Sequence, residues 1–158
     1  LNGAPVPQEA IDRAVKYVLA HHSPKTGTFG YQNSTSEADK LTGAGLLCLE
    51  LCGKHGDPAT LRAGQYLKRN FRNLERTNRQ GYGLYYTAQG LFQLGGETWK
   101  NFSDWMYAYW LPRQADDGHW QIRDDGCAYY QTSLVILALT VPFRQLPIYQ
   151  RDETVDEE

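Results

Sequence analysis

One pattern occurs three times along the chain, as ADKLTGAGLLCL at 38–49, GLYYTAQGLFQL at 83–94 and AYYQTSLVILAL at 128–139. The copies are 45 residues apart, so each one places a threonine at the same position: Thr42, Thr87 and Thr132. A small residue follows each threonine, and larger apolar residues recur four, five and seven positions after it. Such regular spacing indicates an internal repeat.

Each copy of the pattern is expected to form a helix. Spacings of four and seven residues bring side chains to one helical face, whereas a half-buried strand would require alternation. Between 41 and 51 the one charged residue is Glu50, so we expect this helix to be buried on more than one side. Gly45 and Gly90 each lower helix propensity by about 1 kcal/mol relative to Ala. We therefore expect another backbone to approach closely at both glycines.

A more amphipathic helix is expected before each copy. The first has an apolar stripe formed by Ile11, Val15, Val18 and Leu19. The second begins at Asp57-Pro58, because Asp accepts hydrogen bonds from free amides and Pro needs no donor in the first turn. The third is expected over 98–111, where Pro112 ends it.

The helices pair into three hairpins, with approximate bounds 7–53, 57–96 and 97–141. We expect one all-α domain over 1–149, in which a polar outer layer of helices covers an apolar inner layer. The last residues, 150–158, are expected to form an acidic, solvated tail.

The loop before the third copy resembles a known repeat motif. Its sequence is QADDGHW at 114–120, which matches the Q-x-x-x-G-x-W signature of the squalene cyclase and prenyltransferase repeat through Gln114, Gly118 and Trp120. The segment 23–29 is a degraded version that keeps Gly27 and an aromatic residue. In this family the motif is structural: its ring packs against the neighbouring helix, and its Gln amide ties the outer helix end to the next loop.

The resemblance covers about 10–141 and implies an α/α toroid. Rings of this family commonly contain five or six hairpins whose inner helices line a central cavity. Three hairpins are visible here, so the expected fold is an arc of about half a toroid. An arc exposes apolar surface at its open edges. We therefore expect self-association or flanking repeats of a longer chain.

A zinc site is the first alternative that the resemblance suggests. The segment 125–127 is similar to an Asp-Gly-Cys segment in the β subunit of protein prenyltransferases, which implies Asp125 and Cys127 as zinc ligands for a prenyl transfer enzyme. The family's third ligand is a His in a Tyr-His-Thr context, and Gln131 takes that place here. This missing ligand favours a protein that is not an enzyme and has no certain cofactor.

The tyrosines provide the candidate ligand-binding residues. Rings on a concave surface can hold an isoprenoid, a peptide or a sugar by apolar contact, with hydroxyl groups for orientation. The candidates are Tyr85, Tyr86, Tyr129, Tyr130 and Gln131. We expect a non-catalytic module that binds a ligand or serves as a scaffold. A carbohydrate-active toroid that uses Asp116 or Asp117 as an acid is the second alternative.

The composition excludes two classes of partner. The 158 residues include 16 Lys and Arg against 18 Asp and Glu without a basic cluster, which argues against nucleic acid. The longest apolar run, 134–141, is too short to span a membrane. Three cysteines, an odd number, fit a reducing compartment such as the cytoplasm better than a secreted disulfide framework. The chain begins at Leu1 rather than Met, which leaves export open.

Overall fold

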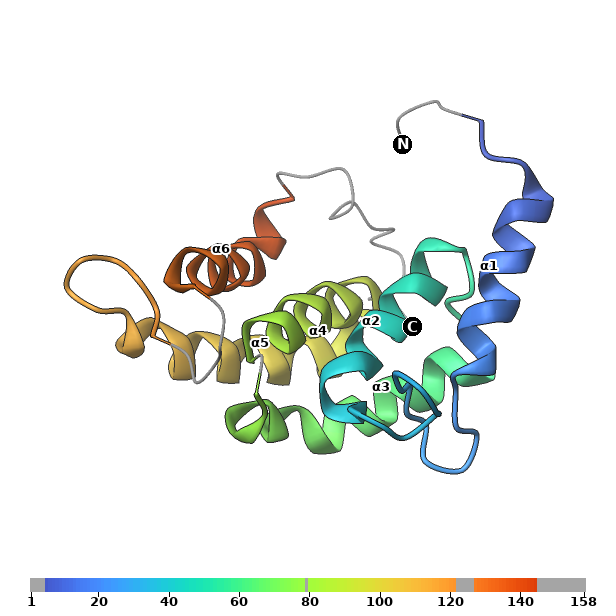
Figure 1. Ribbon diagram of the computed structural model, residues 1–158, viewed down its shortest axis with the longest axis horizontal. Coiled ribbons are helices and arrows are strands. Elements are labelled where there is room, and N and C mark those ends of the chain that lie inside the picture. Colours follow the sequence, from blue (N-terminus) through green and yellow to red (C-terminus); the bar gives the residue numbers. More distant parts are fainter. Residues whose placement is uncertain (1–4, 79, 122–126, 145–158) are drawn as a thin grey trace.

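The computed structural model of the chain describes residues 5–78, 80–121 and 127–144, and this part is built from helices (Figure 1). The α-helices are α1 (Gln8–Ala20), α2 (Ala38–Leu51), α3 (Pro58–Asn70), α4 (Gln80–Leu94), α5 (Gly96–Trp110) and α6 (Ala128–Leu139). Short 3-10 helices follow three of them: η1 (Phe71–Arg76), η2 (Leu111–Arg113) and η3 (Val141–Phe143). Within the described ranges no strand occurs, so the predicted all-α class is confirmed.

The helix ends follow the local sequence. Asp57 caps α3 by accepting a hydrogen bond from the backbone N–H of Ala59 over 2.8 Å, with Pro58 as the first helical residue. Helix α5 begins two residues before the expected position, after Gly95 with φ of 74°. It gives way to η2 at Leu111, because Pro112 has no N–H for an α-helical bond.

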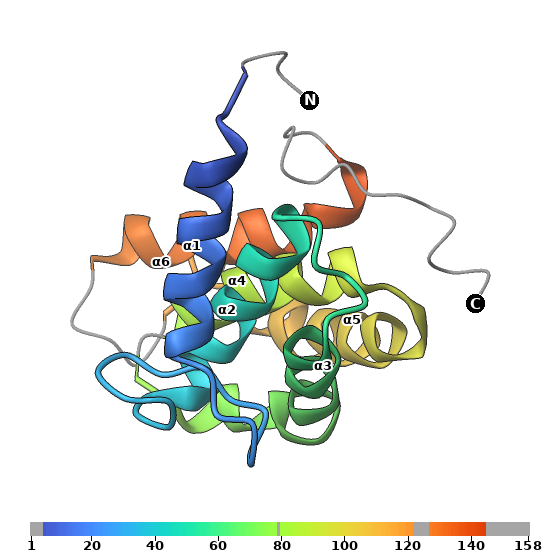
Figure 2. The ribbon, with the colours of Figure 1, turned by 90° about the vertical axis from the view of Figure 1, so that its right-hand side faces the viewer.

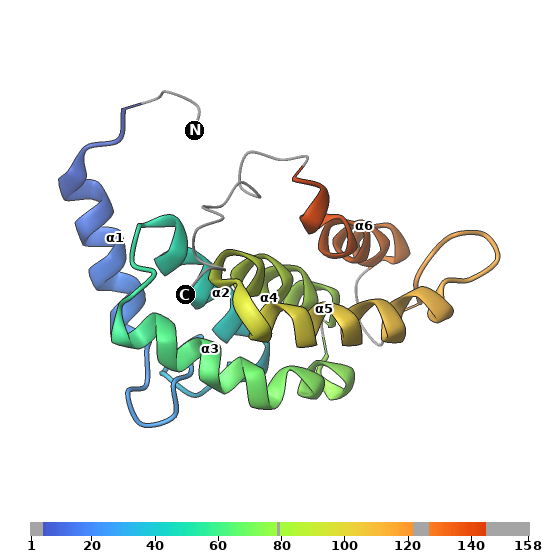
Figure 3. The same ribbon diagram turned by 180° about the vertical axis from the view of Figure 1, so that it is seen from behind.

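The six helices form two groups. We call α2, α4 and α6 the inner helices, and α1, α3 and α5 the outer helices. The inner helices lie side by side, with α4 in contact with both of its neighbours. Helices α3 and α5 contact each other and cover one side of α2 and α4 (Figures 1 and 3). Helix α1 packs against α2 at one end of the inner row (Figure 2).

Glycine allows the inner helices α2 and α4 to approach closely. A Cβ atom at Gly43 would lie 2.6 Å from the backbone of Thr87, and one at Gly90 would lie 2.7 Å from the carbonyl oxygen of Gly43. The expected backbone approach at Gly90 is thus confirmed. At Gly45 the expectation was wrong, because the neighbour is the ring of Phe29 rather than a backbone.

The core lies between the inner and outer helices. Its fully buried side chains include Leu46, Leu84, Leu91, Phe102, Met106 and Val135. Phe71 of η1 meets Phe102 edge to face, with ring centroids 5.5 Å apart. This packing holds the inner helices from the outer side. None of the helices in the described ranges is long and apolar enough to cross a membrane.

The motif loop is held by hydrogen bonds to its surroundings. The Gln114 side chain donates to the carbonyl oxygen of Gly118 over 2.9 Å, which closes the loop after α5. The buried indole of Trp120 donates to the carbonyl oxygen of Trp110 over 2.7 Å, and its backbone N–H donates to Thr132 Oγ1 over 3.1 Å. The motif residues therefore connect the end of α5 with α6.

Candidate functional site

Three tyrosines form a continuous aromatic group on α4. Tyr82 and Tyr86 have ring centroids 4.7 Å apart, and Tyr85 and Tyr86 have centroids 4.9 Å apart. All three side chains are half-buried. They share one side of the helix because residues three and four positions apart are neighbours on a helical surface.

The tyrosine group extends to both neighbouring inner helices. Burial raises the pKa of Tyr86, and the nearby phenols of Tyr85 and Tyr130 and the thiol of Cys48 raise it further. Tyr130 belongs to α6 and Cys48 to α2, so groups from three helices lie near the Tyr86 phenol. We call the surface that carries these four residues and Tyr82 the inner face.

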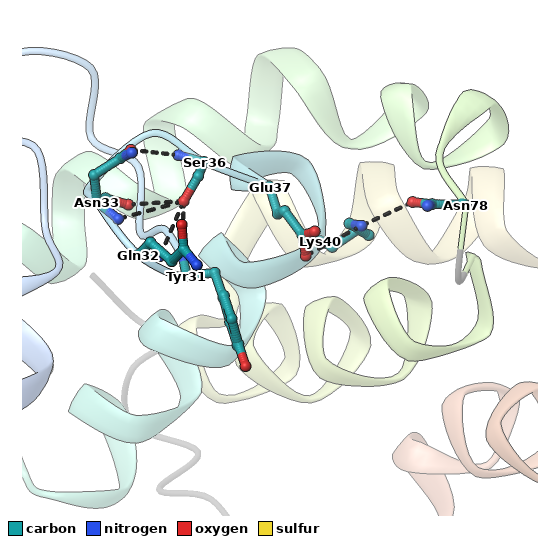
Figure 4. A network of polar contacts seen from close by, with 7 residues as sticks. All are labelled: Tyr31, Gln32, Asn33, Ser36, Glu37, Lys40 and Asn78. Atoms are coloured by element: carbon teal, nitrogen blue, oxygen red, sulfur yellow. Dashed lines mark hydrogen bonds and ion pairs between the residues drawn. The ribbon is translucent and has the colours of Figure 1, made fainter.

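A cavity of about 330 Å³ lies at one end of the inner face. It is lined by Tyr31, Glu37, Lys40, Leu41 and Tyr82. Only 6% of Lys40 is exposed. Its ammonium lies 3.2 Å from Glu37 Oε2 and donates to Asn78 Oδ1 over 2.8 Å (Figure 4). The buried charge is thus balanced by a carboxylate, which gives the cavity a polar end without a strong net charge.

The loop before α2 is ordered by its own hydrogen bonds and carries Tyr31. Ser36 Oγ accepts from the backbone N–H groups of Tyr31 and Gln32, each over 3.1 Å (Figure 4). Asn33 Oδ1 accepts from the backbone N–H of Ser36 over 2.8 Å. Such side chain to backbone bonds are typical of Asn and Ser in turns. They fix the position of Tyr31 beside the cavity.

A second cavity, of about 230 Å³, adjoins the first. Its walls come from α1, the loop and α2: Tyr17, Val18, His21, Phe29, Gly30, Tyr31, Leu41, Ala44, Gly45 and Cys48. Tyr31 and Leu41 line both cavities. The two cavities therefore share Tyr31 and Leu41 as walls, and most of their lining is apolar or aromatic.

The five predicted ligand-binding residues are not all in one place. Tyr85, Tyr86 and Tyr130 lie together on the inner face. Gln131 is 2% exposed and so presents almost no surface. Tyr129 is 85% exposed and lines a different cavity, between α6 and the loop at 117–119.

The described residues do not provide a set of ligands for the predicted zinc site. Asp125 lies outside the described ranges, and Cys127 is the exposed residue that precedes α6. In the part of the chain that the structure describes, no three side chains among His, Cys, Asp and Glu come together as a metal site. We therefore derive no chemistry through zinc.

The cavity beside α6 contains one of the two proposed acid residues. Asp117 Oδ1 and His119 Nδ1 are 2.5 Å apart, and this hydrogen bond lowers the pKa of Asp117. A general acid at neutral pH needs a raised pKa instead. The environment of Asp117 thus disfavours this residue as the acid.

Sequence reasoning missed the cavity residues of α1 and α2. Lys40 gave a signal that could have been used, because a charged residue in a nearly apolar helix needs a partner if it is buried. Tyr17 and Tyr31 gave no comparable signal, since their places beside the cavities depend on how α1 and the loop before α2 pack against α2. No family model, curated protein or solved structure matches this chain.

Proposed function

We propose that the chain is a non-catalytic binding module that takes up an elongated apolar ligand, of the isoprenoid class, along its inner face. The proposed architecture is an arc of three hairpins that resembles half of an α/α toroid of the prenyltransferase and squalene cyclase repeat. The row of inner helices, covered on one side by α3 and α5, supports this architecture.

The adjoining cavities are the observation that carries the proposal. Two neighbouring cavities that share Tyr31 and Leu41 as walls fit a chain-like molecule better than a compact one. Aromatic walls provide apolar contact area, and Lys40 and Glu37 offer a polar end for a hydroxyl or similar group. The tyrosine group at 82–86 continues the same surface beyond the cavities.

The choice of a binding role over catalysis rests on the polar groups that line the cavities. Lys40 is held by Glu37 and Asn78, so it is not poised as a base. A zinc-dependent prenyl transferase remains the alternative proposal, and it would need Asp125 and a third ligand outside the described residues.

Fluorescence of the apolar probe N-phenyl-1-naphthylamine tests the proposal directly. The purified chain should bind the probe, and farnesol should displace it whereas maltose and an unrelated peptide should not. Ala44 is half-buried on the cavity wall, so Ala44→Leu should fill the space and weaken probe binding about tenfold. Ala108→Leu, at an exposed position of α5, is the matched control. The proposal would be rejected if Ala44→Leu and Ala108→Leu bound the probe equally well, or if maltose displaced the probe.

A further inference from the structure

A further cavity lies at the end of α5 and has a volume of about 230 Å³. Its walls come from η1, the start of α4, the end of α5, η2 and the end of the motif loop: Glu75, Gln80, Tyr109, Trp110, Arg113 and Gln121. No described residue lines both this cavity and the two cavities of the proposed apolar site. We call it the α5-end cavity.

One wall of the α5-end cavity carries a carboxylate that the protein holds in place. Glu75 is half-buried, and its Oε1 accepts a hydrogen bond from the Trp105 indole over 2.9 Å. Gln80 is 6% exposed and donates through Nε2 to the backbone carbonyl oxygen of Glu75 over 2.6 Å. Within the described ranges Oε2 of Glu75 accepts no hydrogen bond. This oxygen is therefore available to a donor on a ligand.

Another wall carries a guanidinium whose orientation is also fixed. The guanidinium carbon of Arg113 lies 3.8 Å from the centroid of the Tyr109 ring, and Nη1 donates to the Tyr109 carbonyl oxygen over 2.6 Å. Stacking on the ring and the bond to the backbone together fix the plane of the guanidinium. Its remaining N–H groups have no acceptor among the described residues, so they can bind an acceptor that enters the cavity.

The two charges of the cavity do not neutralise each other. In the part of the chain that the structure describes, no ion pair joins Glu75 to Arg113 or either of them to another side chain. The fork of an arginine matches the two oxygens of a carboxylate, and a glutamate accepts from an ammonium. A molecule that carries both a carboxylate and an ammonium therefore complements both charges at once.

A buried donor in the same cavity wall also lacks an acceptor. Trp110 is 2% exposed, and its indole Nε1 is buried without a hydrogen-bond partner among the described residues. Buried indole N–H groups usually have an acceptor, because a buried donor without one loses its bond to water. The indoles of Trp105 and Trp120 follow this rule by donating to Glu75 and to the backbone of Trp110. The exception at Trp110 indicates that an acceptor belongs in this cavity.

We propose that the α5-end cavity binds a small zwitterion of the α-amino acid class. The ligand carboxylate accepts hydrogen bonds from Arg113 and from the Trp110 indole, and the ligand ammonium donates to Glu75. Cavities for drug-sized ligands have volumes of about 300 to 1,000 Å³, so this smaller space suits a molecule of amino-acid size. This binding does not depend on the apolar ligand proposed for the inner face.

NMR titrations with three matched probes test the proposal. L-alanine carries both charges, propionate lacks the ammonium, and ethylamine lacks the carboxylate. L-alanine should shift the indole N–H signal of Trp110, one of four tryptophans in the chain. It should also bind about tenfold more tightly than either fragment, because each fragment leaves one charge of the cavity without a partner. The proposal would be overturned if L-alanine left this signal unchanged, or if propionate or ethylamine bound as tightly as L-alanine.

Two variants separate the two contacts. Glu75→Gln keeps an acceptor for Trp105 and should weaken L-alanine and ethylamine about tenfold while propionate is unaffected. Arg113→Gln should weaken L-alanine and propionate while ethylamine is unaffected. Arg69→Gln is the matched control, because Arg69 of α3 is also exposed and also donates to a carbonyl oxygen four residues earlier. The assigned contacts would be wrong if Arg113→Gln and Arg69→Gln had equal effects, or if either cavity variant weakened all three probes alike.

Discussion

The backbone N–H of Phe29 donates a hydrogen bond to Oγ1 of Thr42 over 3.2 Å. The backbone N–H of Trp120 makes the same bond to Thr132 over 3.1 Å. Both rings are buried, and both threonines hold the same position in the repeat. The repeated threonine thus fastens a loop and its aromatic residue to an inner helix in the first and third hairpins.

The middle hairpin lacks this bond, which gives the first prediction. Thr87 Oγ1 is buried and has no hydrogen-bond partner among the described residues. Leu74 stands at the matching position, 13 residues earlier, where Phe29 precedes Thr42. We expect Thr42→Val to lower the free energy of unfolding by about 1 to 3 kcal/mol, because the buried N–H of Phe29 loses its acceptor. Thr87→Val should be neutral or stabilising. Urea unfolding of both variants measures the difference, and equal losses would contradict it.

The close contact between α2 and α4 gives a second prediction. Gly43→Ala places a methyl group 2.6 Å from the backbone of Thr87, so the two helices must move apart. We expect a loss of about 1 to 3 kcal/mol in the free energy of unfolding, as is typical of overpacked cores. Gly56→Ala is the control, since nothing lies within 4 Å of the added atom. Thermal unfolding compares the pair, and a Gly43→Ala protein as stable as its control would show that the interface can relax.

The pH dependence of stability gives a third prediction. Burial raises the pKa of Glu50, an effect only partly opposed by its hydrogen bond with His55 over 2.8 Å. The folded state therefore holds the Glu50 proton more tightly than the unfolded state. As pH rises above the ordinary pKa of a glutamic acid, the stability that Glu50 contributes is lost. Relative to Glu50→Gln, the native protein should thus become less stable as pH rises above about 4, the ordinary pKa of a glutamic acid.

Glu97 provides the control of opposite sign. Its hydrogen bond with Lys68 lowers its pKa, so its contribution is present above the ordinary pKa and is lost as pH falls. Relative to Glu97→Gln, the native protein should therefore become more stable as pH rises. Urea unfolding at several pH values measures both slopes, and a flat profile for Glu50→Gln would contradict the inferred burial.

The proposed binding of a ligand on the inner face gives a fourth prediction. Tyr86→Ala should weaken binding of N-phenyl-1-naphthylamine, because Tyr86 is the centre of the aromatic group next to the cavities. Tyr129→Ala should leave binding unchanged, since Tyr129 lines the cavity on the other side of α6. Fluorescence titration of the two variants separates these sites. A larger effect from Tyr129→Ala would place the binding site at the cavity beside Tyr129 instead.

The repeat spacing was sufficient to predict the helices and their order. Thr42, Thr87 and Thr132 align the three inner helices, and Asp57 with Pro58 marks the start of α3 as the structure shows it. Local patterns of this kind depend on helical periodicity and capping, which the sequence contains directly.

The candidate site was less predictable because it depends on folding between distant segments. Tyr85 and Tyr86 were identified since they belong to the repeated pattern. Tyr31 was missed, because its position beside Leu41 follows from hydrogen bonds inside a loop. The exposure of Cys48 was not predictable either, since an apolar helix does not reveal which of its sides remains open.

The ordered loop at 31–36 has a consequence for the kinetics of the proposed ligand binding. Because Ser36 and Asn33 already hold the backbone of Tyr31, a ligand that enters beside this ring does not have to organise the loop first. Little conformational entropy is then lost during association. The residence time of the proposed ligand would be set by its contacts inside the cavities, while its arrival would be limited mainly by diffusion.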